Sequence, residues 1–220
     1  MTQAGSDIHE ASRQSRSEFV ADMAIHLCGL AAGVVGTAIL LFIAVSLGQT
    51  TLIASGVYAA GLVVMLACST AYNWAAHSGR CAEWLQRSDQ SAIFLMIAGS
   101  YTPFTTLHLS GAWAVGLTAV VWSVAALGIG LRFAAPALFQ KSALVLYLGL
   151  GWIGLIALGP LHQALSGSVL ALLILSGSLF TAGVIFYTRQ ELPFRKAIWH
   201  GFVVAGASVH FAAVTASVGP

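Results

Sequence analysis

Five polar side chains lie near the ends of long apolar runs, at spacings that could bring them together. Ser69 and Asn73 are four residues apart, as are Lys196 and His200, and Asp89 begins an apolar run of its own. Residues four apart in a helix share one face, and an aspartate beside a membrane helix is costly unless it has a partner or a role. These five residues are the candidate functional site, which could serve acid–base chemistry, metal binding or a polar contact between helices.

The chain that carries them has the composition of a membrane protein. Of its 220 residues, 58% are hydrophobic and 7% charged, and the mean hydropathy is +0.88, whereas soluble chains are about 25% charged. The net charge of +2 is small and its charges are scattered, so no nucleic-acid partner is expected. The three cysteines show neither a CxxC spacing nor a disulfide framework. Membrane lipids are the expected partners.

Long apolar runs predict the architecture. A helix needs about 20 apolar residues to cross roughly 30 Å of hydrocarbon, and seven stretches of this chain meet that length. We therefore predict an all-α membrane protein, a seven-transmembrane helix bundle in one domain over residues 23–217, after a polar cytoplasmic tail at 1–22. The predicted helices are residues 23–47, 52–76, 90–109, 112–133, 142–161, 167–187 and 197–217.

Basic residues predict the orientation of this bundle. All nine Lys and Arg lie in the tail or beside the connections that follow the second, fourth and sixth predicted helices. Cytoplasmic segments carry the Lys/Arg excess in membrane proteins. We therefore predict a cytoplasmic N-terminus and a C-terminus outside.

This orientation places the polar side chains in one layer near the cytoplasm. They come from the first, second, third and seventh predicted helices, in each case from the end on the cytoplasmic side. The residues at this level are Asp22, His26, Ser69, Asn73, Asp89, Lys196 and His200. Simpler roles stay open for some of them: Asp89 could charge the first turn of a helix, and Lys196 could extend to the membrane interface.

Three motifs resemble those of the hemolysin III family, within the progestin and adipoQ receptor superfamily. Residues 89–104 resemble the signature of the family's third helix. Residues 69–73 resemble its SxxxH element in the second helix, and residues 197–211 resemble the HxxxH segment of its seventh helix. The motifs occur in the family's order, and the resemblance covers the whole membrane domain.

The resemblance implies a zinc ion near the cytoplasmic side, held by one histidine from SxxxH and two from HxxxH, and some relatives are lipid amide hydrolases. It implies catalytic roles for Ser69, Asp89 and His200, with His200 also a metal ligand. Asn73 and Lys196 occupy the other two cofactor-binding positions. The helix-three aspartate would hold a metal-bound water, since zinc makes hydroxide available near neutral pH.

This chain departs from the family pattern at two of the three ligand positions. Asn73 is a poor zinc ligand, and the Lys196 ammonium would repel the cation. We therefore expect a metal-free clasp in which Lys196 pairs with Asp89, with Asn73 and His200 hydrogen-bonded around them. If zinc is bound instead, its ligands are to be sought at His26, His77 and His200.

Three functions are compared on this basis. The first is an integral membrane protein acting in membrane homeostasis or lipid sensing, located in a bacterial inner (plasma) membrane. The alternative is a zinc-dependent hydrolase of membrane lipid amides or esters. A pore-forming cytolysin, suggested by the family name, ranks third because the sequence offers no ring of charges to line a conducting path.

Overall fold

The structure is a computed structural model that describes residues 15–78 and 83–219. Residues 1–14 of the predicted tail, with Arg13, lie outside the described residues, as does Arg80. The described residues form helices and contain no strand. In chain order the elements are α2 (Arg16–Ser46), α3 (Gln49–His77), α4 (Glu83–Leu107), α5 (Gly111–Ala134), α6 (Pro136–Trp152), the 3₁₀ helix η1 (Ile153–Ala157), α7 (Leu158–Ala164), α8 (Gly167–Tyr187) and α9 (Arg195–Val218).

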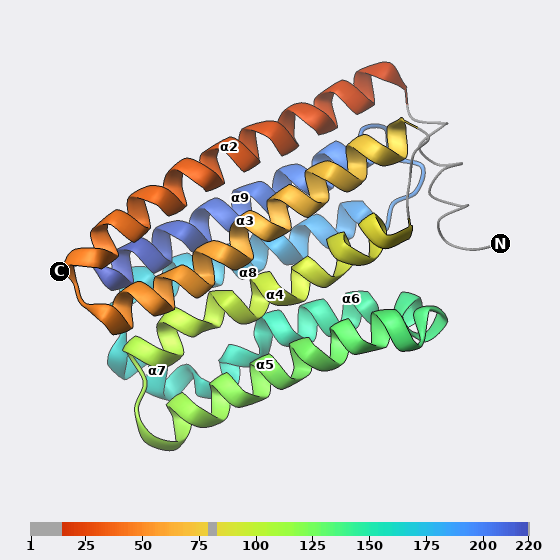
Figure 1. Cartoon of the computed structure of the whole chain (residues 1–220). Helices are drawn as coiled ribbons and strands as arrows, with labels where there is room; N and C mark the ends of the chain where they lie inside the picture. Colours follow the sequence, from red (N-terminus) through yellow and green to blue (C-terminus); the bar gives the residue numbers. More distant parts are fainter. Residues whose placement is uncertain (1–14, 79–82, 220) are drawn as a thin grey trace.

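The long helices lie side by side in one bundle (Figure 1). Along the chain, α6, η1 and α7 follow one another as a single passage, Pro136–Ala164, in which the predicted fifth helix bends through a 3₁₀ segment. Within the described residues, six helical passages are long and apolar enough to cross a membrane. The predicted all-α membrane protein is confirmed.

The remaining long helix, α4, is less apolar because the protein itself surrounds it. It packs against α3, α5, α6 and α9, and it has more buried residues than any other helix, including Gln86, Ser91 and Thr105. Polar residues that face protein need not be compatible with lipid. The central position of α4 therefore explains why the third predicted helix carries the weakest hydrophobic signal.

Two glycines allow α3 and α4 to pack with their backbones in contact. A Cβ atom at Gly61 would lie 3.1 Å from the Leu95 carbonyl oxygen, and one at Gly99 would lie 3.1 Å from the Val57 carbonyl oxygen. Small residues at such crossings permit close approach of membrane helices. This contact fixes the face of α4 that carries Asp89 relative to the face of α3 that carries Ser69.

The first helix begins at Arg16, well before the predicted start at residue 23. Ser15 is its N-cap: the Ser15 N–H donates to Glu18 Oε2 (2.8 Å) and the Glu18 N–H donates to Ser15 Oγ (3.2 Å). This capping box satisfies the free N–H groups of the first turn. Apolarity alone places the start of this helix later in the sequence, because the first turns of α2 are polar.

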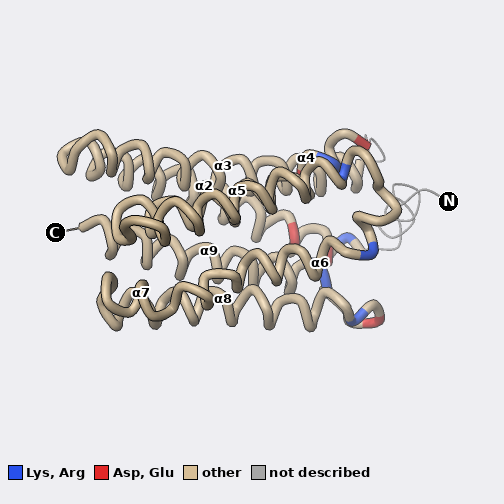
Figure 2. Tube along the Cα trace, turned by 90° about the horizontal axis from the view of Figure 1, so that it is seen from below, with Lys and Arg blue, Asp and Glu red and all other residues tan. Residues whose placement is uncertain are grey.

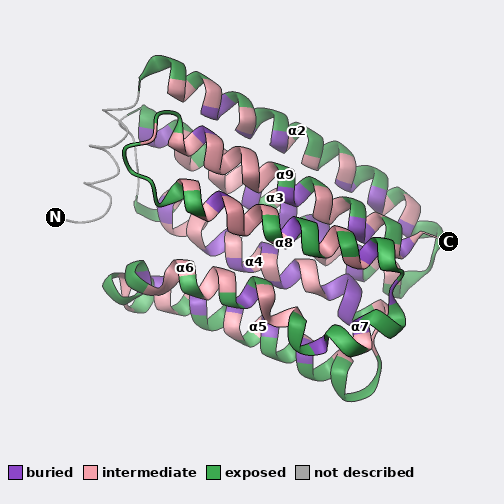
Figure 3. Cartoon of the chain, turned by 180° about the vertical axis from the view of Figure 1, so that it is seen from behind, coloured by how far each residue is buried: buried purple, intermediate pink, exposed green. Residues whose placement is uncertain are grey.

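Charged residues are concentrated at one end of the bundle, and buried residues are concentrated along its axis. The described Lys and Arg gather at the end of the bundle where α2 and α9 begin, and α9 ends at the opposite end (Figure 2). We call the first of these the charged end. Buried residues line the inner faces of the helices while exposed ones cover the outside (Figure 3). The arrangement agrees with the positive-inside rule, and the cytoplasmic placement of the charged end stays a prediction.

Candidate functional site

A cluster of polar side chains joins four helices near the charged end. We call it the polar cluster, and its members are Asp22 and His26 of α2, Ser69 and Asn73 of α3, Asp89 of α4 and His200 of α9.

Helix α2 supplies the two most deeply buried members. Asp22 is 2% exposed and His26 4% exposed, and they lie one turn apart on the face of α2 turned toward α3 and α9. The Nδ1–H of His26 donates to the Asp22 backbone carbonyl at 2.9 Å. Because Nδ1 carries the proton in this hydrogen bond, Nε2 of the neutral ring is left as an acceptor.

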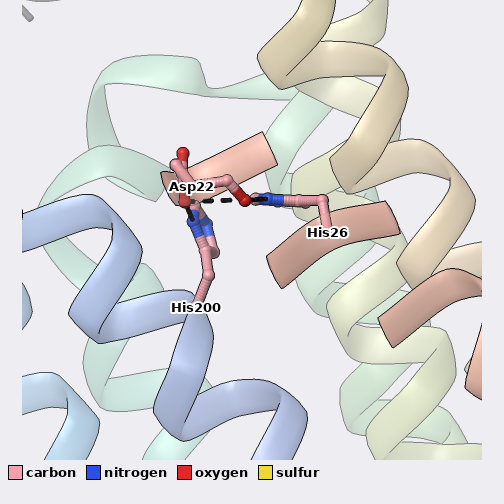
Figure 4. Close-up of side chains that lie close together, drawn as sticks. All are labelled: Asp22, His26 and His200. Carbon is pink, nitrogen blue, oxygen red and sulfur yellow. Dashed lines mark hydrogen bonds and ion pairs between the residues drawn. The ribbon is translucent and has the colours of Figure 1, made fainter. Parts of the chain in front are cut away.

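Helix α9 meets α2 at the Asp22 carboxylate. The Nδ1–H of His200 donates to Asp22 Oδ1 at 2.6 Å, and the His26 and His200 rings lie edge to face with their centroids 4.2 Å apart (Figure 4). A hydrogen bond of this length to a carboxylate is of the stronger, charge-assisted kind. It joins residues that are far apart in the sequence and holds α2 against α9.

Helix α3 provides the remaining hydrogen-bond partners of His26. The Asn73 amide donates one N–H to His26 Nε2 (3.1 Å) and the other to the Ser69 carbonyl of its own helix (3.0 Å). The Ser69 hydroxyl lies 3.2 Å from the same His26 nitrogen. Both ring nitrogens of His26 therefore have hydrogen-bond partners within the protein.

Asp89 enters the cluster from α4. Its carboxylate lies close enough to the Ser69 side chain and to His200 for both to interact with it electrostatically. Ser69 and Asn73 both lie within hydrogen-bond distance of His26 Nε2, so Asp89 is next to the residues that hold His26. Asp89 thereby links the central helix to the contact between α2, α3 and α9.

Lys196 lies at the edge of the cluster, one turn before His200 on α9. Its ammonium interacts electrostatically with Asp22. The pairing of Lys196 with Asp89 that the sequence predicts stays a prediction, and Asp22 is a further acidic residue within reach of the same charge.

The structure brings Ser69, Asn73, Asp89 and His200 together around two further residues. The sequence placed these two at the same membrane depth but gave them no central role. Asp22 and His26 are four apart at the start of the first apolar run, which is the same signal that marked the other two pairs. His77 does not join them, since its exposed ring stacks on Phe19 with centroids 3.5 Å apart at the end of α3.

Asp22, His26 and His200 form a possible metal-binding group. One ligand atom from each lies within 4.8 Å of the others, and two imidazoles with a carboxylate are a donor set that zinc accepts. Their hydrogen bonds argue against an ion in this arrangement. His26 has both nitrogens engaged, and the 2.6 Å between His200 Nδ1 and Asp22 Oδ1 is shorter than the roughly 3.3 Å that separates two ligands on a tetrahedral zinc with bonds of about 2.0 Å.

Comparison with known proteins gives a consistent set of relatives. A hemolysin-3 homolog of Bacillus subtilis (strain 168) is 32% identical over 195 residues, which is 88% of this chain and 91% of that protein. Hemolysin-3 of Bacillus cereus is 39% identical over 123 residues, 56% of each chain. The monocyte to macrophage differentiation factor of Homo sapiens is 28% identical over 167 residues, 74% of this chain and 69% of that protein.

The fold and the cluster define an all-helical integral membrane protein with a buried polar contact between its helices. The family described as "Haemolysin-III related" matches residues 16–211, which include every member of the polar cluster. This chain belongs to that family, as its motifs predicted.

Proposed function

We propose that this protein is a non-catalytic membrane protein that responds to the state of the lipid bilayer, with the polar cluster as a metal-free clasp between α2, α3, α4 and α9. The single observation that carries the proposal is the engagement of both His26 nitrogens by Asp22 and Asn73. A bacterial inner (plasma) membrane is the proposed location, with membrane lipids as partners.

The family's zinc chemistry does not fit the residues of this chain. At the SxxxH position, Asn73 directs an amide N–H at His26 Nε2. A residue that binds a metal ion must instead direct a lone pair at the ion. At the first HxxxH position, Lys196 brings a positive charge next to Asp22. An ammonium and an amide N–H provide locally what a cation would provide, which is a positive partner for carboxylate and imidazole.

The position of α2 supports a response to lipid. Among the described residues, the substantial contacts of this helix are with α3 and α9. Many of its large apolar side chains face outward, with Val35 60% and Phe42 82% exposed. Changes in bilayer thickness act on lipid-facing helices through hydrophobic mismatch, at fractions of a kcal/mol per Å. The hydrogen bonds of Asp22 and His26 oppose such displacement at the charged end.

Two measurements test the clasp. Purified wild-type protein should contain well under one zinc per chain, and a chelator should leave its unfolding temperature unchanged. About one zinc per chain together with a lower unfolding temperature after chelation would overturn the metal-free assignment.

Spin labels on α2 and α9 test the response to lipid. Cys28 on α2 and Ala205→Cys on α9 are exposed, and they can be labelled after replacing the other two cysteines with alanine. We expect the distance between labels to change when short-chain lipids replace long-chain ones, and to broaden in every lipid in Asp22→Ala. A distance that depends neither on lipid nor on Asp22 would refute the proposal.

A second function is favoured by the proximity of Asp22, His26 and His200, whose ligand atoms lie within 4.8 Å. This is a zinc-dependent hydrolase of lipid amides or esters, with Ser69 and Asp89 beside the ion. It requires the Asn73 amide to leave His26. Release of fatty acid from a ceramide-type amide by zinc-loaded wild type, absent in Asp89→Asn, would favour this function over the clasp.

A further inference from the structure

A second polar site lies on the other side of α4, around a buried arginine. Arg132, in the last turn of α5, is 2% exposed and is among the largest fully buried side chains of the protein. Its Nε–H donates to the Gln90 side-chain oxygen, and an Nη2–H donates to Gln86 Oε1 at 3.3 Å. Its guanidinium also lies over the Phe139 ring, 5.6 Å from the centroid. These partners are all neutral.

The charge of Arg132 has no carboxylate in direct contact. Among the described residues, no Asp or Glu oxygen lies within 4.0 Å of this guanidinium. Buried charges in proteins are normally paired or bound to an ion of opposite sign. A guanidinium held by two amides therefore has remaining N–H donors and no carboxylate in direct contact.

A second guanidinium adds to this charge. Arg87 of α4 is close enough to Arg132 for their positive charges to repel. Its Nη2–H donates to Glu83, but its Nε–H is buried without a hydrogen-bond partner. Glu83 is the carboxylate that acts electrostatically on both arginines. Two guanidiniums share one acid, which leaves an excess positive charge and an unused donor.

The site lies where we expect the lipid headgroups. It belongs to the charged end of the bundle, in the first turns of α4 and the last turn of α5. Phe133 and Trp84, which are 53% and 65% exposed, present apolar and aromatic surface to lipid beside it. Aromatic residues favour the membrane–water interface. The Arg87 side chain is 28% exposed whereas Arg132 is 2% exposed, so an anion carried by a lipid would meet Arg87 at the surface, with the charge of Arg132 behind it.

We propose that Arg87 binds the phosphate group of an anionic phospholipid in the leaflet at the charged end, and that the buried charge of Arg132 behind it strengthens this attraction. The planar guanidinium of arginine can donate two parallel hydrogen bonds to two phosphate oxygens. Anionic lipids are enriched in the cytoplasmic leaflet. Gln86 and Gln90, which hold Arg132, flank Asp89 of the polar cluster on α4. The site deepens the proposed response to lipid by naming the lipid class; its role in that response rests on the proposed function, whereas binding itself does not.

The test measures phosphatidylglycerol retained by the full chain, by native mass spectrometry and by titration in nanodiscs of phosphatidylcholine. We expect Arg87→Gln and Arg132→Gln each to weaken retention by about fivefold, from roughly 1 kcal/mol for a basic residue near an anionic surface. Arg132→Lys keeps the positive charge but cannot keep both hydrogen bonds to Gln86 and Gln90, so its retention should fall between that of wild type and that of Arg132→Gln. The matched control is Arg189→Gln in the exposed α8–α9 connection, which should leave retention within about twofold.

The outcomes separate the possible ligands. Equal retention of phosphatidylglycerol and phosphatidylcholine, or unchanged retention in both Arg87→Gln and Arg132→Lys, would overturn the site even if Arg132→Gln does not fold. If inorganic phosphate alone binds and lipid does not, the assignment to a lipid is wrong. Zinc in the purified protein would refute the metal-free clasp and leave the expected retention of phosphatidylglycerol unchanged, so failure of the two proposals can be told apart.

Discussion

The hydrogen bond between Asp22 and His200 is the contact whose removal should weaken the bundle most. The carboxylate is nearly inaccessible, with 4% of the side chain exposed, and His200 is 16% exposed. Removing one partner of a buried charged pair typically costs about 3–5 kcal/mol, because the other is left without compensation. The partial exposure of His200 places Asp22→Ala near about 3 kcal/mol. Asp22→Asn keeps a neutral acceptor and should lose only about 1–2 kcal/mol, the difference between a charge-assisted and a neutral hydrogen bond.

A double-mutant cycle isolates this contact from other effects of the substitutions. Asp22→Ala, His200→Ala and the double variant would be unfolded reversibly in mixed micelles, and their free energies of unfolding compared with wild type. Coupled partners should give an interaction energy of about 1–2 kcal/mol. Glu191→Gln, in the exposed α8–α9 connection, is the control for loss of a surface carboxylate and should stay within about 0.5 kcal/mol of wild type.

Additive single variants would refute the reasoning. If the double variant loses the sum of the two single losses to within about 0.5 kcal/mol, Asp22 and His200 do not stabilise each other. The hydrogen bond at 2.6 Å would then not be what holds α2 against α9 at the charged end.

Three further predictions concern the metal, the packing and the topology. The double change Asn73→His with Lys196→His should create a zinc site, measured as about one zinc per chain against a wild-type control carrying none. Gly128→Val should destabilise the protein by at least about 1–3 kcal/mol in chemical unfolding, because a Cβ there would lie 2.3 Å from a fully buried phenylalanine ring; Gly130→Val, which meets nothing within 4 Å, is the control. A reporter fused after Pro220 should be active only if it works outside the cytoplasm, and cytoplasmic activity would contradict the predicted orientation.

The helical fold could be predicted because length and apolarity are properties of local sequence. Each long apolar run corresponds to a helix or, for residues 136–164, to a passage bent by a 3₁₀ segment. The start of α2 could not be located in this way, because it is set by the capping box at Ser15 and Glu18. The second Glu18 oxygen accepts the Phe194 N–H at 2.8 Å, a contact with a distant residue that hydropathy does not reveal.

The membership of the polar cluster could be predicted in part. The depth of a residue in the membrane follows from the direction of its helix, but the neighbouring helix that its side chain contacts does not. Depth placed Asp22 and His26 in the same layer as Asn73 and His200, but the sequence does not say which face of α2 turns toward α9. That depends on packing, such as Gly29 against Val204, where an added Cβ would lie 2.8 Å from a methyl group.

Asn73 and Lys196, which stand where the family resemblance implies zinc ligands, make physical sense together in the proposed clasp. Asp22 and Asp89 place two acids in one buried layer, and without positive charge nearby they would repel each other. Lys196 stands where the family resemblance implies a ligand, and it interacts with Asp22, so in the proposed metal-free clasp it supplies positive charge in place of the cation. Asn73 stands at the other such position and supplies the N–H that His26 Nε2 accepts. Restoring a histidine at only one of these positions should therefore weaken the clasp without creating a competent metal site.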